Sequence, residues 1–480
     1  MNKNQQTLFP DEKGRPPLSA DLPTMEDDDE MESTQPKYQP PKDRDLPVGP
    51  RELVSNAPPD FKEPTFFAAV TCLAALATRV RAYYPYDGMN EHALLLQTFI
   101  VGEQSAGKSF ARNHVERVIM APLKKRDDEQ RRQEQAYREL RQTASKMDKL
   151  PEPPHTVIRT YPISISIAQL IKRADAPQRY YGTPMTLWSF TDELKAAVES
   201  NKRTFCNIKT IARTSYDLNS TYGVDYLSDN AYSATVDIMI CSLYLTTPSA
   251  LDAYADNDFI EGGGVTRTIL VTLHDTLGDD APIFKQLTPK QKKAIDNLLE
   301  LMDNDVYDKA SNTVKPEKFI DMQWLFPTIC AWCDEQKRLI LRSASRAHDT
   351  FYKRSSVSAF RIATLCAYLY GLEQGTDKLT SAQRKRVKQI YLFAAQYILD
   401  AMMGKWGHRY EQLTQKRIEA QSKVRVPLFN QLTDTFTRDQ LTELVKRNET
   451  GTPVRVLLSK WKAKGWIEEK QKYVYKKTEK

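Results

Sequence analysis

The feature that most constrains this chain is the segment at residues 102–109, which reads GEQSAGKS and fits the pattern G-x-x-x-x-G-K-[ST] without a mismatch. An apolar run at 94–101 precedes it and is typical of a buried parallel strand, and residues 110–119 follow with helical spacing. A strand, a glycine loop and a helix N-terminus in this order form an anion site, because unpaired backbone N–H groups point at the phosphates. The pattern therefore predicts a loop that binds a nucleoside triphosphate rather than a chance glycine turn.

The parts of this motif have expected roles toward ATP and Mg²⁺. Lys108 reaches the β- and γ-phosphates, and the Ser109 hydroxyl ligates Mg²⁺. The residues predicted to contact the nucleotide are Gly102, Glu103, Gln104, Ser105, Ala106, Gly107, Lys108, Ser109 and Phe110.

Two acidic residues follow a second apolar stretch, at 185–191. In P-loop ATPases an acid at the end of a strand holds Mg²⁺ through water, and a nearby glutamate polarises the attacking water. Asp192 is therefore predicted to serve Mg²⁺ and Glu193 to act as the general base. The alternative is that this Asp-Glu pair, which stands directly before Leu194, caps a helix.

A third predicted strand, at 235–245, ends at two threonines. In RecA-like and AAA+ sheets this place commonly carries a polar residue that senses the γ-phosphate, so Thr246 or Thr247 is predicted to contact the nucleotide. Equally, Thr247 is a suitable cap for a helix that starts at Pro248. The sequence leaves both readings of Thr247 open.

A glycine-rich turn at 262–264 leads through Arg267 into a strand that ends at residue 273. Arg267 is predicted to reach the nucleotide of a neighbouring subunit as a finger that stabilises charge in the transition state. The alternative is a surface arginine beside a strained turn. Arg361 lies on an otherwise apolar helix, where a buried ion pair is favoured over a second phosphate sensor.

Strands that alternate with helices predict an α/β fold with a mainly parallel sheet. A stretch with charges of both signs at 115–150 predicts an exposed helical arm, and a solvated spacer is favoured over a docking arm. The predicted organisation is an acidic, Pro-rich disordered tail at 1–45, a helical region at 46–92, an ATPase core at 93–285, a helical region at 286–420 and a C-terminal domain at 421–480.

The C-terminal domain reads as helix, turn, helix and basic two-stranded wing, which is the order of a winged helix. Residues 421–480 carry 14 Lys and Arg against 7 Asp and Glu, a net charge of +7. This charge favours nucleic acid over a protein as the partner, with phosphate contacts and little base specificity. The residues predicted to contact DNA are Arg455, Lys460, Lys462, Lys464 and Lys472.

Six scattered cysteines are typical of reduced thiols in the cytoplasm, and the one CxxC pair, Cys330 and Cys333, is expected to be buried in a helix. The N-terminus has no apolar signal segment, and the longest apolar stretch, at 66–77, is too short to span a bilayer. We therefore expect a cytoplasmic protein without a membrane anchor.

The order of these motifs resembles a family of bacterial P-loop proteins that were long filed as a domain of unknown function and are described as primase-helicase-like. Such proteins occur in prophages, mobilisable transposons and genomic islands, often near integrase, excisionase and primase genes. The resemblance covers about residues 46–400 and rests on Leu46-Pro47, Tyr86-Asp87-Gly88, the loop at 102–109, the charged arm, Asp192-Glu193, Thr246-Thr247-Pro248 and Gly264–Arg267. It implies a RecA-like core, ATP hydrolysis and a role in replication or mobilisation of the element.

These expectations favour an ATP-hydrolysing, helicase-like DNA motor that works as a homo-oligomer, such as a hexameric ring. No primase zinc site is evident in the sequence, so priming is expected from a separate primase. The alternative is an ATP-switched DNA-binding or loader protein, or a regulator of excision, that does not unwind DNA. A small-molecule P-loop kinase is a third class, which the basic C-terminal domain disfavours.

Overall fold

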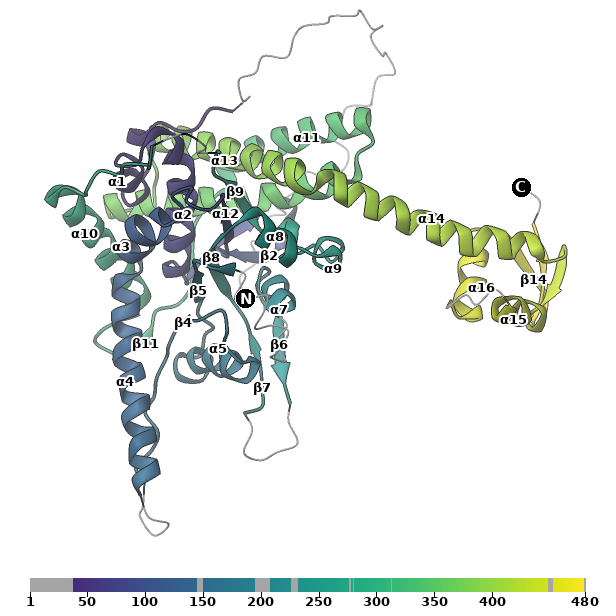
Figure 1. Ribbon diagram of the computed structural model, residues 1–480, viewed down its shortest axis with the longest axis horizontal. Helices are drawn as coiled ribbons and strands as arrows, with labels where there is room; N and C mark the ends of the chain where they lie inside the picture. Colours follow the sequence, from purple (N-terminus) through teal and green to yellow (C-terminus); the bar gives the residue numbers. More distant parts are fainter. Residues whose placement is uncertain are drawn as a thin grey trace, which may run out of the picture. The chain divides into compact units, whose positions relative to one another are not determined.

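A five-stranded sheet forms the centre of the fold, and the strand pairings within it are all parallel (Figure 1). The computed structural model describes residues 38–144, 150–194, 208–225, 232–275, 278, 280–311, 313–447 and 452–478. In spatial order the strands are β4 (Thr160–Tyr161), β5 (Leu187–Thr191), β8 (Ile240–Thr246), β3 (Gln97–Val101) and β9 (Ile269–Thr272). The chain is therefore a mixed α/β protein with a parallel sheet, as the alternation of strands and helices predicts.

The two middle strands, β8 and β3, are buried along their whole length. Strands covered on both faces read as continuous apolar runs, which explains why both were visible in the sequence. The predicted strand at 235–245 divides, however, at residues 238–239. Its first part is β7 (Ala234–Asp237), which pairs antiparallel with β6 (Thr221–Val224), and only its second part, β8, enters the parallel sheet.

Helix α2 (Lys62–Leu76) packs on β3 and β8 and is surrounded by protein, because every residue from Pro64 to Ala75 is buried. A helix that is apolar all round belongs in a core, as expected for the apolar stretch at 66–77. Further helices between residues 50 and 261 include α1 (Pro50–Val54), α5 (Ile167–Tyr181), α7 (Ile208–Thr214), α8 (Pro248–Tyr254) and α9 (Asn257–Glu261).

The second half of the predicted N-terminal helical region is not helical. It forms β1 (Val80–Tyr84) and β2 (Asp87–Ala93), an antiparallel pair that β12 (Lys318–Phe319) extends on the other side of β1. Arg81 within β1 is buried and lies 3.6 Å from Glu317. A partner strand so distant in sequence leaves no local signal. The predicted tail at 1–45 also ends earlier than expected, because residues 38–45 belong to the described fold. Within this segment, Asp45 pairs with Arg386 at 3.0 Å.

Residues 286–420 are largely helical, as predicted, and α12 and α13 pack against each other along their lengths. The short strands β10 (Tyr307–Asp308) and β11 (Thr313–Val314) pair antiparallel within this region. Both cysteines of the CxxC pair are free and lie in α11 (Phe326–Ser343), but only Cys333 is buried, whereas Cys330 is partly exposed, so the expectation of a buried pair holds for Cys333 alone. The helices are α10 (Pro289–Val306), α11 (Phe326–Ser343), α12 (Arg346–Gln374), α13 (Ser381–Met402) and α14 (His408–Gln431), with a π-helical turn at Met403–Gly407.

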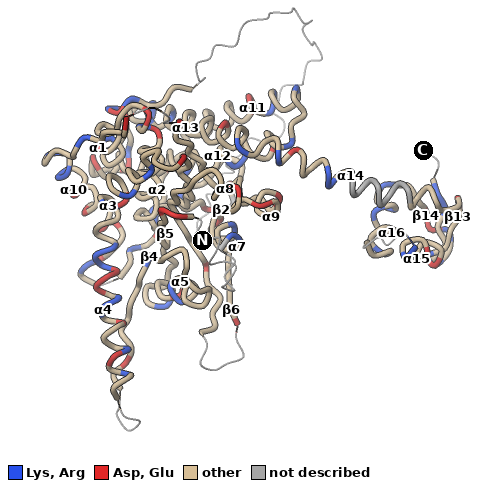
Figure 2. Tube along the Cα trace, viewed as in Figure 1, with Lys and Arg blue, Asp and Glu red and all other residues tan. Residues whose placement is uncertain are grey.

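The charged arm is one helix, α4 (Ala121–Thr143), which follows a π-helical turn (Ala111–Glu116) and α3 (Arg117–Ile119). Lys, Arg, Asp and Glu alternate along it (Figure 2), and most of them are exposed. Asp127 is nevertheless fully buried, because α4 lies against the segment that leads into β4. The expectation of a purely solvated spacer is therefore wrong for this part of the arm.

The C-terminal residues form a small unit with its own core, which includes Phe436, Leu457 and Trp461. It contains α15 (Arg438–Arg447), α16 (Val454–Ala463) and a three-stranded antiparallel sheet in the order β13 (Thr435–Thr437), β15 (Val474–Lys477) and β14 (Ile467–Gln471). The order of helix, helix and hairpin matches the expected order. The assignment to the winged-helix class stays a prediction.

Candidate nucleotide-binding site

The glycine loop leaves the carboxyl end of β3 and takes two left-handed residues, Ser105 (φ 66°) and Gly107 (φ 76°). The turn is closed by a hydrogen bond of 3.2 Å from the backbone N–H of Ala106 to the carbonyl oxygen of Glu103. A Cβ on Gly107 would lie 2.6 Å from Cγ of Pro282, so conformation and space both require glycine here. The motif thus forms the tight loop that its glycines predict.

Lys108 folds back over this loop. Its ammonium group donates to the carbonyl oxygen of Gly102 at 2.7 Å and also to that of Glu103. Burial lowers the pKa of Lys108, and the charge of Glu103 opposes this shift. The cation is therefore held in the centre of the loop by groups that an anion can replace.

An aromatic cluster fixes the start of the following helix. The Phe110 ring stacks on Phe284 at 5.3 Å between centroids, and Phe61 meets both rings edge-on. His114, about one turn further along the chain, stacks on the Phe284 ring, with 4.7 Å between the ring centroids. Phe110 is buried, whereas Glu103, Gln104, Ser105 and Ser109 are exposed. Phe110 thus anchors the helix and leaves the polar residues of the loop open to solvent.

The carboxyl ends of β3, β8 and β5 meet at one edge of the sheet. The Gly102 N–H donates to the Thr246 carbonyl at 3.2 Å, and Thr191 lies in register with Tyr244. Because the strands are parallel, the loop, the two threonines and the acidic pair lie along the same edge. Ligands of open α/β sheets bind outside this edge, where the connections of neighbouring strands diverge.

Asp192 and Glu193 follow β5 and are both exposed. The carboxylate of Asp192 pairs with the guanidinium of Arg112, and the Glu193 N–H donates to the Thr191 hydroxyl at 3.2 Å. Arg112 follows Ser109 by three residues, a spacing that brings side chains to one helix face. Asp192 therefore lies beside the face that carries Ser109. Arg112 is not among the predicted site residues, although its spacing from the motif is visible in the sequence.

The Ser109 hydroxyl and the Asp192 carboxylate are the kind of oxygen ligands that Mg²⁺ takes, together with waters and phosphate oxygens. Among the described residues, no group of three or more His, Cys, Asp and Glu side chains is arranged to hold a metal ion. A Mg²⁺ bound with its nucleotide needs only one or two protein ligands, so these two residues fit such an ion.

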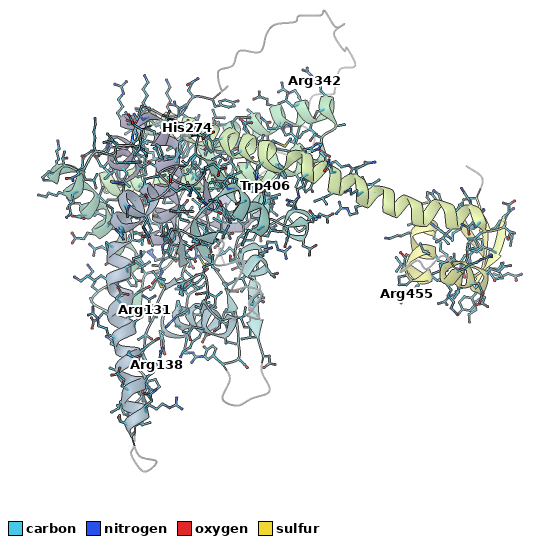
Figure 3. The ribbon with its side chains drawn as sticks, viewed as in Figure 1. Arg131, Arg138, His274, Arg342, Trp406 and Arg455 are labelled. Carbon is cyan, nitrogen blue, oxygen red and sulfur yellow. The ribbon has the colours of Figure 1, made fainter. Side chains whose placement is uncertain are left out.

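Thr247 caps α8, because its hydroxyl accepts a hydrogen bond from the Ala250 N–H at 3.4 Å. The capping role that the sequence left open is thus present, and the role as a nucleotide sensor stays a prediction. Thr246 is buried, and its hydroxyl donates to the Thr247 carbonyl at 3.2 Å. Two further polar residues, His274 (Figure 3) and Asp275, follow β9 at this same edge and were not singled out in the sequence.

Arg267 lies at the opposite edge of the sheet. It ends a 3₁₀ turn two residues before Ile269, which pairs with Thr98 near the start of β3. Its guanidinium lies 3.6 Å from the Asp217 carboxylate, and burial lowers its pKa. Arg267 is therefore not beside the phosphate loop of its own subunit. A role as a finger toward a neighbour's nucleotide stays a prediction.

Arg361 is buried and forms an ion pair, as favoured from the sequence, although the side chain of its partner Asp217 is 43% exposed. Its guanidinium donates to the Leu95 carbonyl at 2.9 Å, lies 3.8 Å from Asp217 and sits 4.0 Å from the centre of the Tyr216 ring. Arg354 approaches the same carboxylate at 3.6 Å. Three arginines thus share Asp217 at the edge that is remote from the loop.

The predicted DNA-contacting residues of the C-terminal unit are all exposed, and Arg455 is labelled on α16 in Figure 3. Lys462 pairs with Glu469 across the unit, and Lys464 lies 4.8 Å from the Trp466 ring centre. The others in this set are Lys460 and Lys472, and Lys472 lies 5.4 Å from the Tyr473 ring centre. The unit therefore presents cations next to aromatic rings.

No helix in the part of the chain that the structure describes is long and apolar enough to cross a membrane. The sequence was also compared with protein-family models and with curated proteins, and neither comparison gives a match.

Proposed function

We propose that this protein binds and hydrolyses ATP and uses the energy to act on DNA as a helicase-like motor. The observation that carries the proposal is the loop at the carboxyl end of β3. There, left-handed Ser105 and Gly107 shape a turn around the Lys108 ammonium, which rests on the Gly102 carbonyl. A tight glycine loop that leads into a helix, together with a central cation, has the elements of a triphosphate site.

In this proposal each side chain of the edge has a task. Lys108 binds the β- and γ-phosphates, and Ser109 with Asp192 holds Mg²⁺, which neutralises negative charge on the phosphates. Glu193 orients and polarises the attacking water. The ion pair between Asp192 and Arg112 has to open for this, and its cost is small because both side chains are nearly half exposed.

The C-terminal unit is proposed to be a winged helix that grips nucleic acid. Two helices and an antiparallel sheet enclose a core around Trp461, and Arg455, Lys460, Lys462, Lys464 and Lys472 project from it. Lysine contacts to phosphates position a protein on DNA without reading its sequence. This property suits a motor that must move along any sequence.

The five-stranded parallel sheet is compatible with a RecA-like core, because β8 lies between the loop-bearing strand β3 and the acid-bearing strand β5. Together with the resemblance noted in the sequence, this supports a cytoplasmic ATPase that assembles as a homo-oligomeric ring and serves replication or mobilisation of a mobile element beside a separate primase. Arg267 of one subunit is then the candidate finger for the next.

The experiment compares ATP turnover in the wild type, in Lys108→Ala and in a matched control, Lys125→Ala, whose lysine is exposed on α4. We expect Lys108→Ala to lose at least about a hundredfold in turnover, with DNA affinity within about twofold, because the lysine acts on phosphate charge. The control keeps full turnover. Unchanged turnover in Lys108→Ala, or no heat of association between folded wild type and Mg·ATP, overturns the proposal.

An ATP-switched loader without unwinding activity is the alternative, and a strand-displacement assay separates the two. Displacement that depends on ATP and is lost in Lys108→Ala supports the motor. ATPase activity that DNA stimulates, without displacement, supports the loader. ATPase activity that DNA does not change contradicts both and returns the small-molecule kinase as the leading class.

A further inference from the structure

A cavity of about 410 Å³ lies between the second half of α4 and helix α5. The segment at 153–156 and Tyr232 complete its wall. This volume falls within the range of about 300–1,000 Å³ that is typical of small-ligand sites. None of the residues assigned above to ATP or DNA lines it.

The cavity is strongly basic. Five of the residues that line it are cations and two are acids, and both acids are already engaged. Glu134 accepts two hydrogen bonds from Arg173, at 2.5 and 2.9 Å, and Asp175 pairs with Arg179 at 2.7 Å. The remaining cations are Arg138, Arg141 and Lys172.

These three cations have little compensation within the chain. Arg138 reaches the shared Glu134 only at 3.3 Å, and its side chain is 61% exposed. No hydrogen bond or ion pair of Arg141 or Lys172 is recorded within the described ranges, and Lys172 acts on Glu134 only through its charge. The cavity therefore has an excess of positive charge that an anionic ligand can neutralise.

Aromatic rings stand among these charges. Tyr137, Tyr180 and Tyr232 line the cavity, and Tyr180 is one of the exposed large side chains of the protein. His155 stacks on the Tyr180 ring at 4.6 Å, and Arg179 lies 5.7 Å from the centre of the Tyr232 ring. Cations that follow a phosphate backbone, interleaved with rings on which bases stack, are the features of a single-strand binding site.

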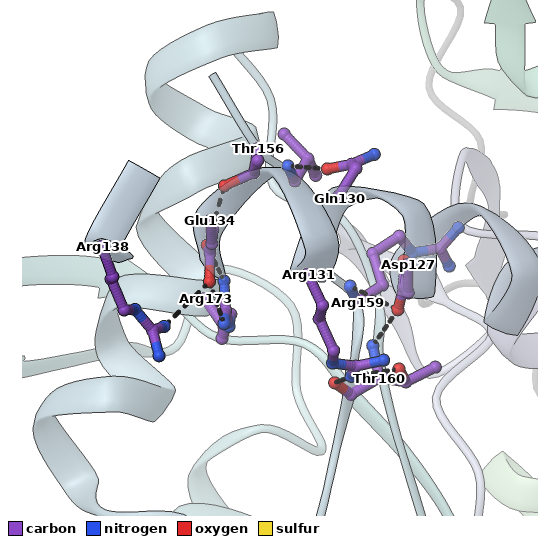
Figure 4. A network of polar contacts seen from close by, with 10 residues as sticks. Asp127, Gln130, Arg131, Glu134, Arg138, Thr156, Arg159, Thr160 and Arg173 are labelled. Carbon is purple, nitrogen blue, oxygen red and sulfur yellow. Dashed lines mark hydrogen bonds and ion pairs between the residues drawn. The ribbon is translucent and has the colours of Figure 1, made fainter. Parts of the chain in front are cut away.

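The walls of the cavity are held in place. The carboxylate of Glu134 joins α4 to α5 through Arg173, and it also accepts from the Thr156 hydroxyl at 2.8 Å (Figure 4). Nearer the start of α4, Asp127 and Arg131 bond to the segment at 159–160. The basic groups are therefore presented from an anchored helix rather than from a free arm.

The cavity lies toward the edge of the sheet that is opposite to the phosphate loop. Thr156 comes before β4, and Tyr180 lies at the end of α5, shortly before β5. Both are thus on the amino side of parallel strands, whereas the loop follows the carboxyl end of β3. A ligand here is distinct from a nucleotide bound by the loop of the same subunit.

We propose that the cavity between α4 and α5 is a binding site for single-stranded nucleic acid, in which Arg138, Arg141 and Lys172 contact phosphates and Tyr180 stacks on a base. This site goes beyond the proposed function, which assigns DNA binding to the C-terminal unit alone. It places a nucleic-acid contact on the ATPase core itself, and it needs no ATP hydrolysis.

The test measures fluorescence anisotropy of a labelled oligothymidylate with the full chain, without ATP. The double variant Arg141→Glu/Lys172→Glu is compared with Lys125→Glu/Arg132→Glu, which reverses two exposed charges of α4 outside the cavity. We expect the first pair to lower affinity by about tenfold or more and to reduce the slope of log K against log salt by about 1.4, since each phosphate contact contributes about 0.7. The control pair retains more of its affinity and slope than the cavity pair.

Stacking is tested separately with Tyr180→Ala and Tyr180→Phe. The alanine variant is expected to lose about tenfold in affinity and the phenylalanine variant less than about twofold, because Phe keeps the ring. The proposal is overturned if the cavity double variant and the control double variant bind the oligothymidylate equally tightly. It is also overturned if the wild type binds polyglutamate as tightly as the oligothymidylate. Repeating the titration in Lys108→Ala separates this result from the proposed function, because a loss of ATP hydrolysis leaves the site intact.

Discussion

The carboxylate of Asp127 accepts a hydrogen bond of 2.6 Å from the backbone N–H of Thr160, so that a side chain of α4 replaces the strand that is missing beside β4. The same oxygen accepts from the Arg159 N–H at 3.0 Å. Among the residues that the structure describes, β4 is the last strand of the sheet, and no strand lies beside its outer N–H groups. Covering such an edge is one way in which proteins prevent it from pairing with other chains.

Replacing Asp127 by alanine is expected to lower the free energy of unfolding by about 2–4 kcal/mol, because two buried N–H groups lose their acceptor. Urea unfolding followed by circular dichroism measures the change. Glu129→Ala is the matched control, since Glu129 is exposed on the same helix and pairs only with Arg132, and it should stay within about 0.5 kcal/mol. Equal stabilities of the two variants would contradict a supporting role for Asp127.

The pH dependence of stability should reveal the Glu134 contacts. Burial acts to raise the pKa of Glu134, but hydrogen bonds from Arg173 and Thr156 and the charge of Lys172 outweigh it and lower the pKa from 4.5 to about 2. A lowered pKa in the folded state stabilises the protein above the unfolded value and loses this effect as the pH falls toward the folded value. The stability difference between wild type and Glu134→Gln should therefore shrink between pH 4.5 and about 2. A constant stability difference across that pH window would show that these contacts do not lower the pKa of Glu134.

Substitutions at two glycines separate the cost of a left-handed backbone conformation from the cost of steric overlap. Gly375→Ala imposes a residue on a left-handed position (φ 66°) with open space around it, and we expect a loss of about 1 kcal/mol. Gly107→Ala has the same backbone problem and also brings Cβ to 2.6 Å from Pro282, so its loss should be larger by about 1–3 kcal/mol. The additional change Pro282→Ala should recover the second part only. Thermal unfolding of the three variants and the wild type measures this, and equal losses at the two glycines would exclude the overlap.

Opening the ion pair between Arg112 and Asp192 should change magnesium dependence more than stability. Both side chains are nearly half exposed, so Arg112→Ala should alter the free energy of unfolding by less than about 1 kcal/mol. If Asp192 serves Mg²⁺, the free carboxylate should lower the Mg²⁺ concentration for half-maximal ATPase activity, and Asp192→Asn should raise it. Identical magnesium curves for both variants and the wild type would remove Asp192 from the metal site.

The two roles of Thr247 can be separated by substitution. Thr247→Ala removes the cap of α8 and should cost about 1 kcal/mol, whereas Thr247→Ser keeps a hydroxyl and should cost less than half of that. A residue that senses the γ-phosphate should in addition slow ATP turnover in the alanine variant, at a temperature where both variants are folded. Normal turnover in a destabilised Thr247→Ala would leave capping as its function.

The part of the candidate site that could be predicted is the loop whose residues are close together in the sequence. The motif specifies its own loop, because Gly107 and Lys108 act within a few residues of each other, and the apolar runs at β3 and β8 give the buried strands. The acidic pair was visible because it follows such a run. At these positions the conformation favoured by the local sequence is also the one that the tertiary packing requires.

What could not be predicted depends on partners that are far apart in the chain. Strand β1 pairs with β12, more than 200 residues away, and its buried Arg81 gives no strand signal. The basic cavity combines α4 and α5 through Glu134 and Arg173, and charge patterning alone indicates only a solvated helix. The glycine-rich turn before Arg267 suggests an arginine finger, but the position of Arg267 depends on the register in which β9 pairs with β3.

Helix α4 has 23 residues, begins directly after the helix that follows the phosphate loop and ends beside the basic cavity. An uninterrupted helix of this size is about 34 Å long, and contacts from Asp127, Arg131 and Glu134 hold it against the segment at 156–160. The charged arm is thus an anchored spacer that fixes the distance between the phosphate loop and the basic cavity.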